Sequence, residues 1–534
     1  MRPTPEGQII LNAARDTRRS FKISAFAGAG KTTLLTMIAK QRLQLRGLYI
    51  SFNKSLQVEA KGKFPRSVLC MTSLALAFRA MNAFSIQHRL EGKGRGLYGR
   101  DIVEKLTGGK FSPTIGEFAK EAVLTFIRTT DPELTLDHVV EGQLPVYRQQ
   151  ILHVAQLLLA DMCDWENGKL PIPHDFYLKA WQMTRPDLSG SFDYILFDEA
   201  QDADPVTKHI IENCQVPVIY VGDTHQSIYR FRGAVNAMDE LQLDEYPLTM
   251  SFRFGRVIAD VANRILEHKP AASRPKYVIM GNPAVESHLG QVNRDEKYAI
   301  LSRTNAGAFD AALQLHGKKV HFIGGSEPVL KMIEAGYALF KGNPVPDNMP
   351  SIKQFQNWEQ LKQYCEKHHD PEIKLIFRMI SKRKDNIPDD LQVIRSRSVG
   401  AISEADVVIS TAHKGKGLEF EQVILWSDFT PPYSERWDDL TEEEKIDELN
   451  LLYVAATRAK YRMQVNEAVF ACLENPAPGM AADDRTPIEG VNLEDLRPRG
   501  GEPAGMEHTI GAPIFDEDEI IIGEEPRHLA MFGA

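Results

Sequence analysis

Short blocks of apolar residues recur along the chain, and each is followed by a polar or glycine-containing turn and then by a helical pattern. A run of about four to eight apolar or alternating positions is typical of a buried strand. The blocks that predict strands lie at residues 21–26, 48–52, 68–71, 194–197, 218–221 and 298–300. Strands that alternate with helices predict an α/β fold with a parallel sheet, because parallel neighbours need crossover connections.

Two helical segments interrupt this alternation. Residues 74–190 are mainly helical and contain a basic, glycine-rich stretch at 91–96, which predicts an exposed loop or, alternatively, a contact with a phosphate backbone. A second, shorter insertion between residues 305 and 399 contains a basic run at 378–384. A solvated helix face is the default interpretation of that run, and contact with a nucleic-acid duplex is the alternative.

The composition changes after about residue 473, where Pro, Gly, Asp and Glu accumulate without periodicity. Such a segment predicts a disordered tail. Its acidic and apolar end at residues 514–522 leaves three interpretations open. The end could dock on a protein partner, fold back over a basic channel, or serve solubility alone.

The strand at 21–26 leads into a turn of small residues and then into a helix that begins with Lys31. Glycines at 28 and 30 allow backbone N–H groups to surround phosphate oxygens, which Lys31 can bridge while the Thr32 hydroxyl ligates Mg²⁺. The usual pattern opens with Gly where this chain has Ala25. A turn without a ligand is the alternative, and the Gly-x-Gly-Lys-Thr core disfavours it. The predicted nucleotide-binding residues here are Ala27, Gly28, Ala29, Gly30, Lys31, Thr32 and Thr33.

A pair of carboxylates follows the apolar strand at 194–197. Asp198 is predicted to hold Mg²⁺, and Glu199 to act as the general base for the attacking water. Two unrelated carboxylates at an exposed strand end are the alternative, which the upstream phosphate loop disfavours.

Further polar and aromatic residues suit a nucleotide and a strand of nucleic acid. Gln8 can pair with the edge of adenine, or simply lie on an exposed helix. Gln226 lies just after the strand at 218–221 and suits a γ-phosphate sensor. The interleaved rings and guanidinium groups that follow suit base stacking and phosphate contacts, and an amphipathic surface turn explains them equally well. These residues are Tyr229, Arg230, Phe231 and Arg232.

The composition is that of an ordinary globular protein, with 43% hydrophobic and 25% charged residues among 534, enough for several domains. No apolar run approaches the roughly 20 residues that a membrane span needs, and residues 1–6 lack a signal-peptide core. The five scattered cysteines predict isolated thiols in a reducing compartment. We therefore expect an intracellular protein, cytoplasmic, nucleoid-associated or nuclear, without a membrane partner. The net charge of −9 is not a nucleic-acid-binding signature, although a local basic channel can exist within it.

The phosphate loop, the Asp198–Glu199 element and the segment after residue 221 together resemble motifs I, II and III of superfamily 1 helicases of the UvrD/Rep type. That family tolerates alanine at the opening position of the loop. Residues 51–55 and 231–237 are most similar to the F-box DNA helicase branch, although no F-box-like segment is present.

Later segments resemble the remaining motifs in the family's order. Residues 251–254 are similar to motif IV, in which Phe252 would stack on adenine and Arg253 would reach the γ-phosphate; the family usually has a small polar residue where this chain has Phe254. Residues 301–305 resemble a segment of the second motor domain. Residues 410–421 resemble motif V, which assigns the ribose contact to Glu419 and places His413 and Lys414 against DNA. Residues 451–460 resemble motif VI, with Arg458 as the arginine finger.

The resemblance implies two RecA-like parallel-sheet motor domains that share ATP and Mg²⁺. The implied divisions are 1–73 with 191–250 (domain 1A), 74–190 (helical insertion 1B), 251–335 with 400–472 (domain 2A), 336–399 (a small 2B-like insertion) and 473–534 (acidic tail). The expected catalytic residues are Lys31, Glu199, Gln226, Arg253 and Arg458. The expected DNA-binding residues are Phe52, Asn53, Lys54, Thr72, Tyr229, Phe231, Arg232, His413 and Lys414. The family often has Thr-x-His where Thr72 begins Thr-Ser-Leu here.

The implied function is that of an ATP-dependent DNA helicase that moves 3′→5′ on single-stranded DNA and unwinds forked DNA. One alternative is a translocase that mainly displaces proteins, because the second insertion is short. An alternative of another class is an ATP-dependent binding module without motor activity, which the presence of Glu199, Arg253 and Arg458 disfavours. A nuclease fusion is disfavoured because the tail has no ordered carboxylate–lysine cluster, and the residues alone leave RNA open as a substrate.

Overall fold

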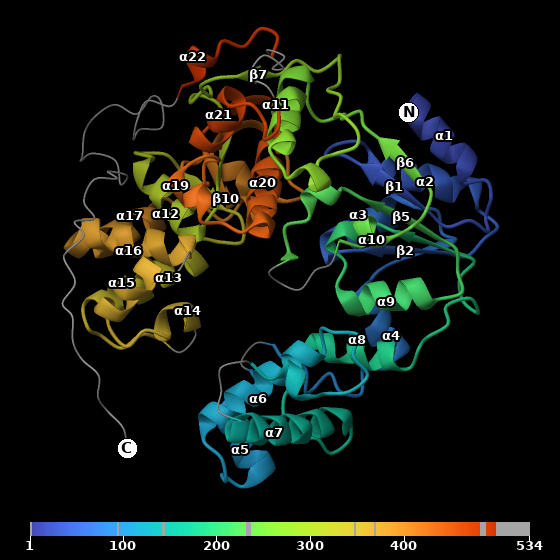
Figure 1. Ribbon diagram of the computed structural model, residues 1–534, viewed down its shortest axis with the longest axis vertical. Coiled ribbons are helices and arrows are strands. Elements are labelled where there is room, and N and C mark those ends of the chain that lie inside the picture. Colours follow the sequence, from blue (N-terminus) through green and yellow to red (C-terminus); the bar gives the residue numbers. More distant parts are fainter. Residues whose placement is uncertain are drawn as a thin grey trace. The chain divides into compact units, whose positions relative to one another are not determined.

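The computed structural model of the chain describes residues 3–92, 95–140, 145–230, 236–346, 349–367, 370–480 and 488–497. The chain divides into two compact units (Figure 1). Unit 1 consists of Met1–Phe252 and Lys276–Met280, and unit 2 of Arg253–Pro275 and Gly281–Ala534. Each unit contains a six-stranded sheet whose described pairings are all parallel. The predicted α/β class with two parallel-sheet domains is therefore confirmed.

The sheet of unit 1 has the strand order β3-β2-β4-β5-β1-β6. Its strands are β1 Phe21–Ala25, β2 Gly47–Ser51, β3 Val68–Thr72, β4 Tyr194–Phe197, β5 Val218–Gly222 and β6 Glu245–Leu248. Every residue of β2, β4 and β5 is buried, as expected for inner strands of a parallel sheet that helices cover on both faces. The carboxyl ends of β1, β4 and β5 therefore lie at one edge of the sheet, and the three predicted ATP motifs follow these ends.

Alternate residues of these strands enter two separate cores. Leu48 and Phe197 belong to a core shared with the helical insertion, whereas Tyr49 and Leu196 belong to a core on the other face with α1 and α2. The helices flanking the sheet are α1 Pro5–Ala13, α2 Lys31–Gln41, α3 Lys54–Lys63, α9 Pro205–Asn213 and α10 Ala237–Glu240, with short 3₁₀ turns η2 Ala200–Asp202 and η3 Thr224–Gln226. The insertion contains α4 Ser73–Ala80, α5 Gly99–Thr107, α6 Pro113–Phe126, η1 Leu136–His138, α7 Pro145–Cys163 and α8 His174–Met183.

The sheet of unit 2 has the strand order β7-β12-β11-β8-β10-β9. Its strands are β7 His288–Leu289, β8 Tyr298–Ser302, β9 Val320–Phe322, β10 Val407–Thr411, β11 Phe420–Leu425 and β12 Ala459–Gln464. The helices before residue 400 are α11 Arg256–Glu267, α12 Asn305–Gln314, α13 Glu327–Phe340, α14 Pro350–Lys353, α15 Trp358–Lys367, α16 Pro371–Arg383 and α17 Ile387–Arg397, with η5 Ala271–Ser273 and η6 Lys384–Asn386. The later ones are η7 Ile402–Glu404, α18 Ala412–Gly415, α19 Glu435–Asp438, α20 Glu442–Ala456, α21 Glu467–Glu474 and α22 Leu493–Leu496.

The helical insertions share the cores of the two sheets. In unit 2, buried residues of α13, α16 and α17 form one core with β8 and β10, and Figure 1 shows these helices grouped together. Each insertion therefore falls within the same compact unit as its sheet. The division between the units lies between Phe252 and Arg253, two residues after the predicted boundary, and residues 276–280 return to unit 1.

Several predicted loops and tails have described structure. In the basic run at 378–384, α16 continues to Arg383, which forms an ion pair with Asp390. The glycine-rich stretch is described on either side of residues 93 and 94, where Gly92 bridges to Arg95. In the region predicted to be a tail, α22 follows α21, and Arg497 pairs with Glu474. The acidic end at 514–522 lies outside the described residues. Among the helices described, none is both long and apolar enough to span a bilayer.

Candidate functional site

The loop between β1 and α2 has the backbone of a phosphate cradle. Gly28 and Gly30 adopt φ angles of 73° and 80°, a left-handed conformation that residues with a Cβ rarely tolerate. Gly30 precedes α2 and brings no side chain to cap its first N–H groups. Amide donors at the start of a helix, followed at once by Lys31, suit an anion such as a phosphate.

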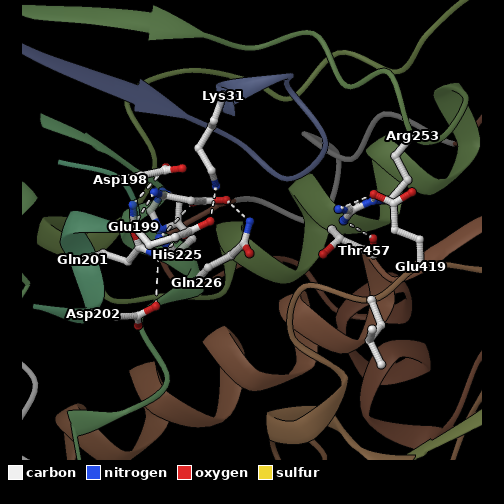
Figure 2. Close-up of polar contacts among 12 residues, drawn as sticks. Lys31, Asp198, Glu199, Gln201, Asp202, His225, Gln226, Arg253, Glu419 and Thr457 are labelled. Carbon is white, nitrogen blue, oxygen red and sulfur yellow. Dashed lines mark hydrogen bonds and ion pairs between the residues drawn. The ribbon is translucent and has the colours of Figure 1, made fainter. Parts of the chain in front are cut away.

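Lys31 and the two predicted carboxylates come together at the carboxyl edge of the sheet (Figure 2). The ammonium of Lys31 lies 3.3 Å from Glu199 Oε1. Burial lowers the pKa of Lys31, but the charges of Glu199, Asp223 and Asp198 outweigh burial and raise it. Burial, together with the neighbouring Glu199, raises the pKa of Asp198. Three carboxylates, those of Asp198, Glu199 and Asp223, thus lie within electrostatic range of the Lys31 ammonium, and such a group of carboxylates is compatible with binding a metal cation.

The chemistry of Asp198 suits Mg²⁺. The carboxylate is buried, its Oδ2 accepts a hydrogen bond from the Tyr49 hydroxyl (2.7 Å), and its Oδ1 accepts one from the backbone N–H of Glu199 (3.0 Å). An oriented carboxylate and the hydroxyl of Thr32 are the hard oxygen donors that Mg²⁺ prefers, with water and phosphate as the remaining ligands. Among the residues that the structure describes, no three His, Cys, Asp or Glu side chains gather to form a complete protein cage.

Glu199 is held in an unusual backbone conformation. Its φ is 54°, in the left-handed region, although it is not a glycine. Such strain occurs often at catalytic positions and aims a side chain that a relaxed strand end would turn elsewhere. Here it accompanies the approach of Glu199 to Lys31.

Sequence reasoning missed two residues that hold these carboxylates. Tyr49 binds Asp198, and Gln201 donates from Nε2 to Glu199 Oε2 at 2.6 Å. Tyr49 lies on β2, whose register places it opposite Leu196 of β4, two residues before Asp198. Only that pairing, which the sequence does not show, brings the hydroxyl to the site. Gln201 follows Glu199 by two residues in the sequence, but spacing alone gave it no role.

The predicted sensor and adenine-binding residues have the following positions. Gln226 is buried and donates from Nε2 to Asp223 Oδ2 (2.7 Å). The backbone N–H of Phe252 donates to Gly28 O (2.8 Å), and its ring, 41% exposed, lies beside Gly30. An exposed aromatic face next to the phosphate loop suits the predicted stacking on a base. Gln8 is exposed on α1, where its amide donates to Asn12 (3.2 Å), as in the surface-helix alternative.

Two predicted DNA-binding rings of unit 1 lie together. Phe52 and Tyr229 stack with centroids 5.3 Å apart and an interplanar angle of 17°, and Phe52 is 42% exposed. Asn53 and Thr72 instead use their side chains to cap α3 and α4, and a capping role explains these two residue types without a ligand.

The other DNA-binding predictions of unit 1 rest on fewer observations. Lys54 is exposed at the start of α3. Phe231 and Arg232 lie outside the described residues.

Unit 2 brings Arg253 and Glu419 together, as Figure 2 shows. The Nε of Arg253 donates to Glu419 Oε1 (2.8 Å), and its Nη1 donates to Thr457 O (2.8 Å). Arg458 differs from an exposed finger, because it is only 1% exposed and donates to Val454 O (2.9 Å). The backbone carbonyl of Thr457 thus binds Arg253, and the backbone carbonyl of Val454 binds Arg458.

The motif V residues lie on the short helix α18. Lys414 is an exposed residue whose Nζ donates to Asn305 Oδ1 (3.3 Å), and partial desolvation of this ammonium by the surrounding protein lowers its pKa. His413 precedes it and is partly exposed. An exposed lysine and a neighbouring histidine are compatible with a contact to a phosphate backbone.

Two segments of the chain match known protein families. Residues 147–244 match the UvrD/REP helicase N-terminal domain, and residues 347–468 match the UvrD-like helicase C-terminal domain. The chain carries both family domains of a UvrD-like helicase. The C-terminal match includes the motif V and motif VI segments of this UvrD-like chain, and the N-terminal match includes Asp198 and Glu199.

Individual relatives of this UvrD-like chain are helicases by name. F-box DNA helicase 1 of Gallus gallus is 33% identical over 511 residues, covering 87% of this chain and 49% of that protein. F-box DNA helicase protein 1 of Schizosaccharomyces pombe is 27% identical over 511 residues, covering 87% of this chain and 57% of that protein. A probable DNA helicase II homolog of Mycoplasma genitalium is 24% identical and covers 55% of this chain and 58% of that protein. The chain thus spans about half the length of the curated relatives it matches.

Proposed function

We propose that this chain is the motor of an ATP-dependent DNA helicase that moves 3′→5′ along single-stranded DNA and unwinds duplex DNA. The observation that carries the proposal is the convergence of Lys31, Asp198 and Glu199 at one sheet edge in a chain with both UvrD-like domains. The direction of movement comes from the family resemblance alone.

The contacts of Lys31 support a specific sequence of events on ATP binding. The Lys31 ammonium, now 3.3 Å from Glu199 Oε1, would turn to the β- and γ-phosphate oxygens, because their charge competes with the carboxylate. Glu199 Oε1 would then be released to accept a proton from the water that attacks the γ-phosphorus, and the P–O bond to ADP would break. Asp198 and Thr32 would hold a Mg²⁺ ion, which would supply positive charge to stabilise the charge on the phosphate groups.

The remaining assignments follow the resemblance. Gln226 would sense the γ-phosphate, and Phe252 would stack on adenine. Arg253 and Arg458 would neutralise charge on the transferred phosphoryl group, for which Arg458 must exchange a carbonyl acceptor such as Val454 O for phosphate. Glu419 would contact the ribose and would then share Arg253 with the nucleotide.

The stacked pair of Phe52 and Tyr229 supplies the proposed contact with single-stranded DNA. Stacking of a base on an aromatic ring contributes roughly 1–3 kcal/mol per base and reads no sequence. Such a contact suits a motor that must pass every base equally well.

The decisive experiment measures ATP hydrolysis with and without single-stranded DNA in four proteins: wild type, Lys31→Ala, Tyr229→Ala and Tyr98→Ala. We expect strong stimulation in wild type, no hydrolysis in Lys31→Ala, and a loss of most of the stimulation in Tyr229→Ala. Tyr98→Ala, which removes another exposed ring of unit 1, is the matched control. Hydrolysis that no nucleic acid stimulates in wild type would overturn the motor and leave the ATP-dependent binding module.

A second candidate, a translocase that mainly displaces proteins, is favoured by the short insertion after α13, whose helices pack into the core of unit 2. Strand displacement on forks with 3′ or 5′ single-stranded arms separates the two candidates when compared with displacement of a protein bound to the same arm. Efficient unwinding from the 3′ arm supports the helicase, and protein displacement without unwinding supports the translocase. RNA arms in the same assay test the nucleic acid preferred.

A further inference from the structure

Gln201 occupies the centre of the hydrogen-bond network of unit 1, between the catalytic carboxylate and the segment that follows β5 (Figure 2). The side chain is fully buried, with 0% exposure. Its Oε1 accepts a hydrogen bond from the backbone N–H of Asp223 (3.0 Å). A backbone N–H can only donate, so this contact fixes the amide oxygen there and directs the NH₂ group the other way.

The NH₂ group of Gln201 holds two carboxylates. Its Nε2 lies 2.6 Å from Glu199 Oε2 and 3.2 Å from Asp202 Oδ2. Lys31 binds the other oxygen of Glu199 at 3.3 Å. When Lys31 turns to a phosphate, the hydrogen bond from Gln201 to Glu199 Oε2 remains. The amide can therefore define the direction in which Glu199 Oε1 points.

Two oxygen atoms of Gln201, one in the side-chain amide and one in the backbone, accept hydrogen bonds from the segment after β5. Besides the contact with Asp223, its backbone carbonyl accepts a hydrogen bond from Ser227 Oγ (3.2 Å). The approach is so close that a Cβ at Gly222 would lie 2.4 Å from Gln201 Oε1. Asp223 in turn accepts a hydrogen bond from Gln226, the predicted sensor. A shift of this segment must therefore move the amide of Gln201.

We propose that Gln201 is a positioning residue that transmits the binding of single-stranded DNA to Glu199. The proposal rests on the proposed function and deepens it. Tyr229 follows Ser227 by two residues and carries the stacked ring pair, so a base bound on that pair acts on the segment that fastens Gln201. DNA binding then moves the Gln201 amide and, through it, changes the orientation of the Glu199 carboxylate, the proposed general base for the attacking water.

Only glutamine has the required donors, acceptor and length at this position. A glutamate of the same size cannot donate to Glu199 and Asp202 and adds a third negative charge beside them. Leucine fills similar space but neither donates nor accepts. Both substitutions therefore break the connection while keeping the volume of the side chain.

The test compares wild type with Gln201→Leu, Gln201→Glu and the control Gln57→Leu. Gln57 is a buried glutamine of unit 1 that donates to Cys70 O (2.9 Å). Four quantities are measured in each protein: basal hydrolysis, hydrolysis saturated with single-stranded DNA, the Kd of a fluorescent single strand, and the Kd of a fluorescent ADP. Circular dichroism and thermal melting check the fold.

We expect the ratio of stimulated to basal hydrolysis to fall at least about tenfold in Gln201→Leu, because a lost hydrogen bond to a buried charge weakens positioning by about that factor. Both Kd values should stay within about threefold of wild type, since Gln201 touches neither ligand in the proposal. Gln57→Leu should keep the wild-type ratio. If Gln201→Leu does not fold, Gln201→Glu decides by the same criteria.

An unchanged stimulation ratio in a folded Gln201 variant overturns the proposal, whatever its basal rate. An equal loss in Gln57→Leu also overturns it, because the effect would then be a general weakening of unit 1. Failure of the proposed function is distinct from both outcomes: wild type itself would then show no stimulation by single-stranded DNA.

Discussion

Asp310 of α12 is a buried carboxylic acid whose ionisation should limit the stability of unit 2. The side chain is 1% exposed. Gln314 donates to its Oδ2 (3.1 Å), and the neighbouring side chain of Trp426 partly favours the ionised form. Burial, reinforced by the charge of Asp428, raises the pKa of Asp310 from 3.8 to about 7. The folded state therefore prefers the protonated acid.

The sign and size of the effect follow from this pKa. Below pH 3.8 the acid is protonated in both states and contributes no pH dependence. Between pH 3.8 and about 7 the unfolded chain releases its proton and the folded chain does not, so stability falls as pH rises. Each pH unit of that window corresponds to about 1.4 kcal/mol, which gives an upper bound of about 4 kcal/mol above pH 7. Between pH 5 and pH 8 the expected loss is about 2–3 kcal/mol.

The perturbation that removes this titration is Asp310→Asn, which keeps an oxygen for Gln314. We expect the free energy of unfolding of the variant to increase relative to that of wild type as the pH rises from 5 to 8. The expected increase is up to about 2–3 kcal/mol. Urea unfolding at both pH values, followed by tryptophan fluorescence, measures the difference; Trp426 lies in the same core. Asp389→Asn, at an exposed position of α17, controls for the substitution itself.

A stability difference between Asp310→Asn and wild type that is the same at pH 5 and pH 8 would refute the reasoning. It would mean that the native carboxyl ionises at the same pH as in the unfolded chain. Destabilisation at pH 8 alone would show the opposite linkage, with the carboxylate favoured by the fold.

Two further predictions concern the hydroxyl group beside Asp198 and the packing of α5 against α6. In Tyr49→Phe, Asp198 loses a hydrogen bond from the hydroxyl, so the Mg²⁺ concentration for half-maximal ATP hydrolysis should rise roughly tenfold. Binding of fluorescent ADP without Mg²⁺ should not change, and a change there would assign Tyr49 to nucleotide binding instead. In Gly116→Ala, the new Cβ would lie 2.1 Å from Gly99 O, and we expect a loss of more than about 2 kcal/mol in urea unfolding as α5 and α6 separate. In Gly62→Ala, the new Cβ would have no neighbouring atom within 4 Å, so this substitution should instead stabilise α3 by about 0.5–1 kcal/mol. Equal effects of the two alanine substitutions on stability would contradict the packing argument.

The fold was predictable because its signals are local. The inner strands β4 and β5 of unit 1 are continuous apolar blocks, whereas β1 alternates apolar and polar residues, and β4 begins and ends where the pattern placed it, at Tyr194 and Phe197. The strand, turn and helix of the proposed phosphate loop were predictable for the same reason, since they are consecutive in the chain. Lys31 opens α2 as the motif requires.

Other features depend on contacts between distant residues. The return of residues 276–280 to unit 1 depends on the bridge between Met250 and Met280, which no periodicity marks. The burial of Arg458 depends on acceptors such as Leu418 O, 40 residues earlier. Asn53 and Thr72 carried both a capping signal and a family signal, and pattern alone could not separate the two.

The same distinction explains why the sequence indicates the proposed reacting groups and not the residues proposed to position them. A residue that touches phosphate must occupy a fixed place in a strand–loop–helix unit, whereas a positioning residue needs only to lie beside its target in space. Tyr49 reaches Asp198 through strand pairing, and Gln201 reaches Glu199 through a turn closed against Asp223. Tyr49 therefore positions the proposed Mg²⁺ ligand Asp198, whereas Gln201 positions the proposed general base Glu199. Tyr49→Phe should therefore alter the Mg²⁺ dependence and leave the stimulation by single-stranded DNA intact, whereas Gln201→Leu should do the reverse. The same change in both variants would mean that the two carboxylates respond as one rigid unit.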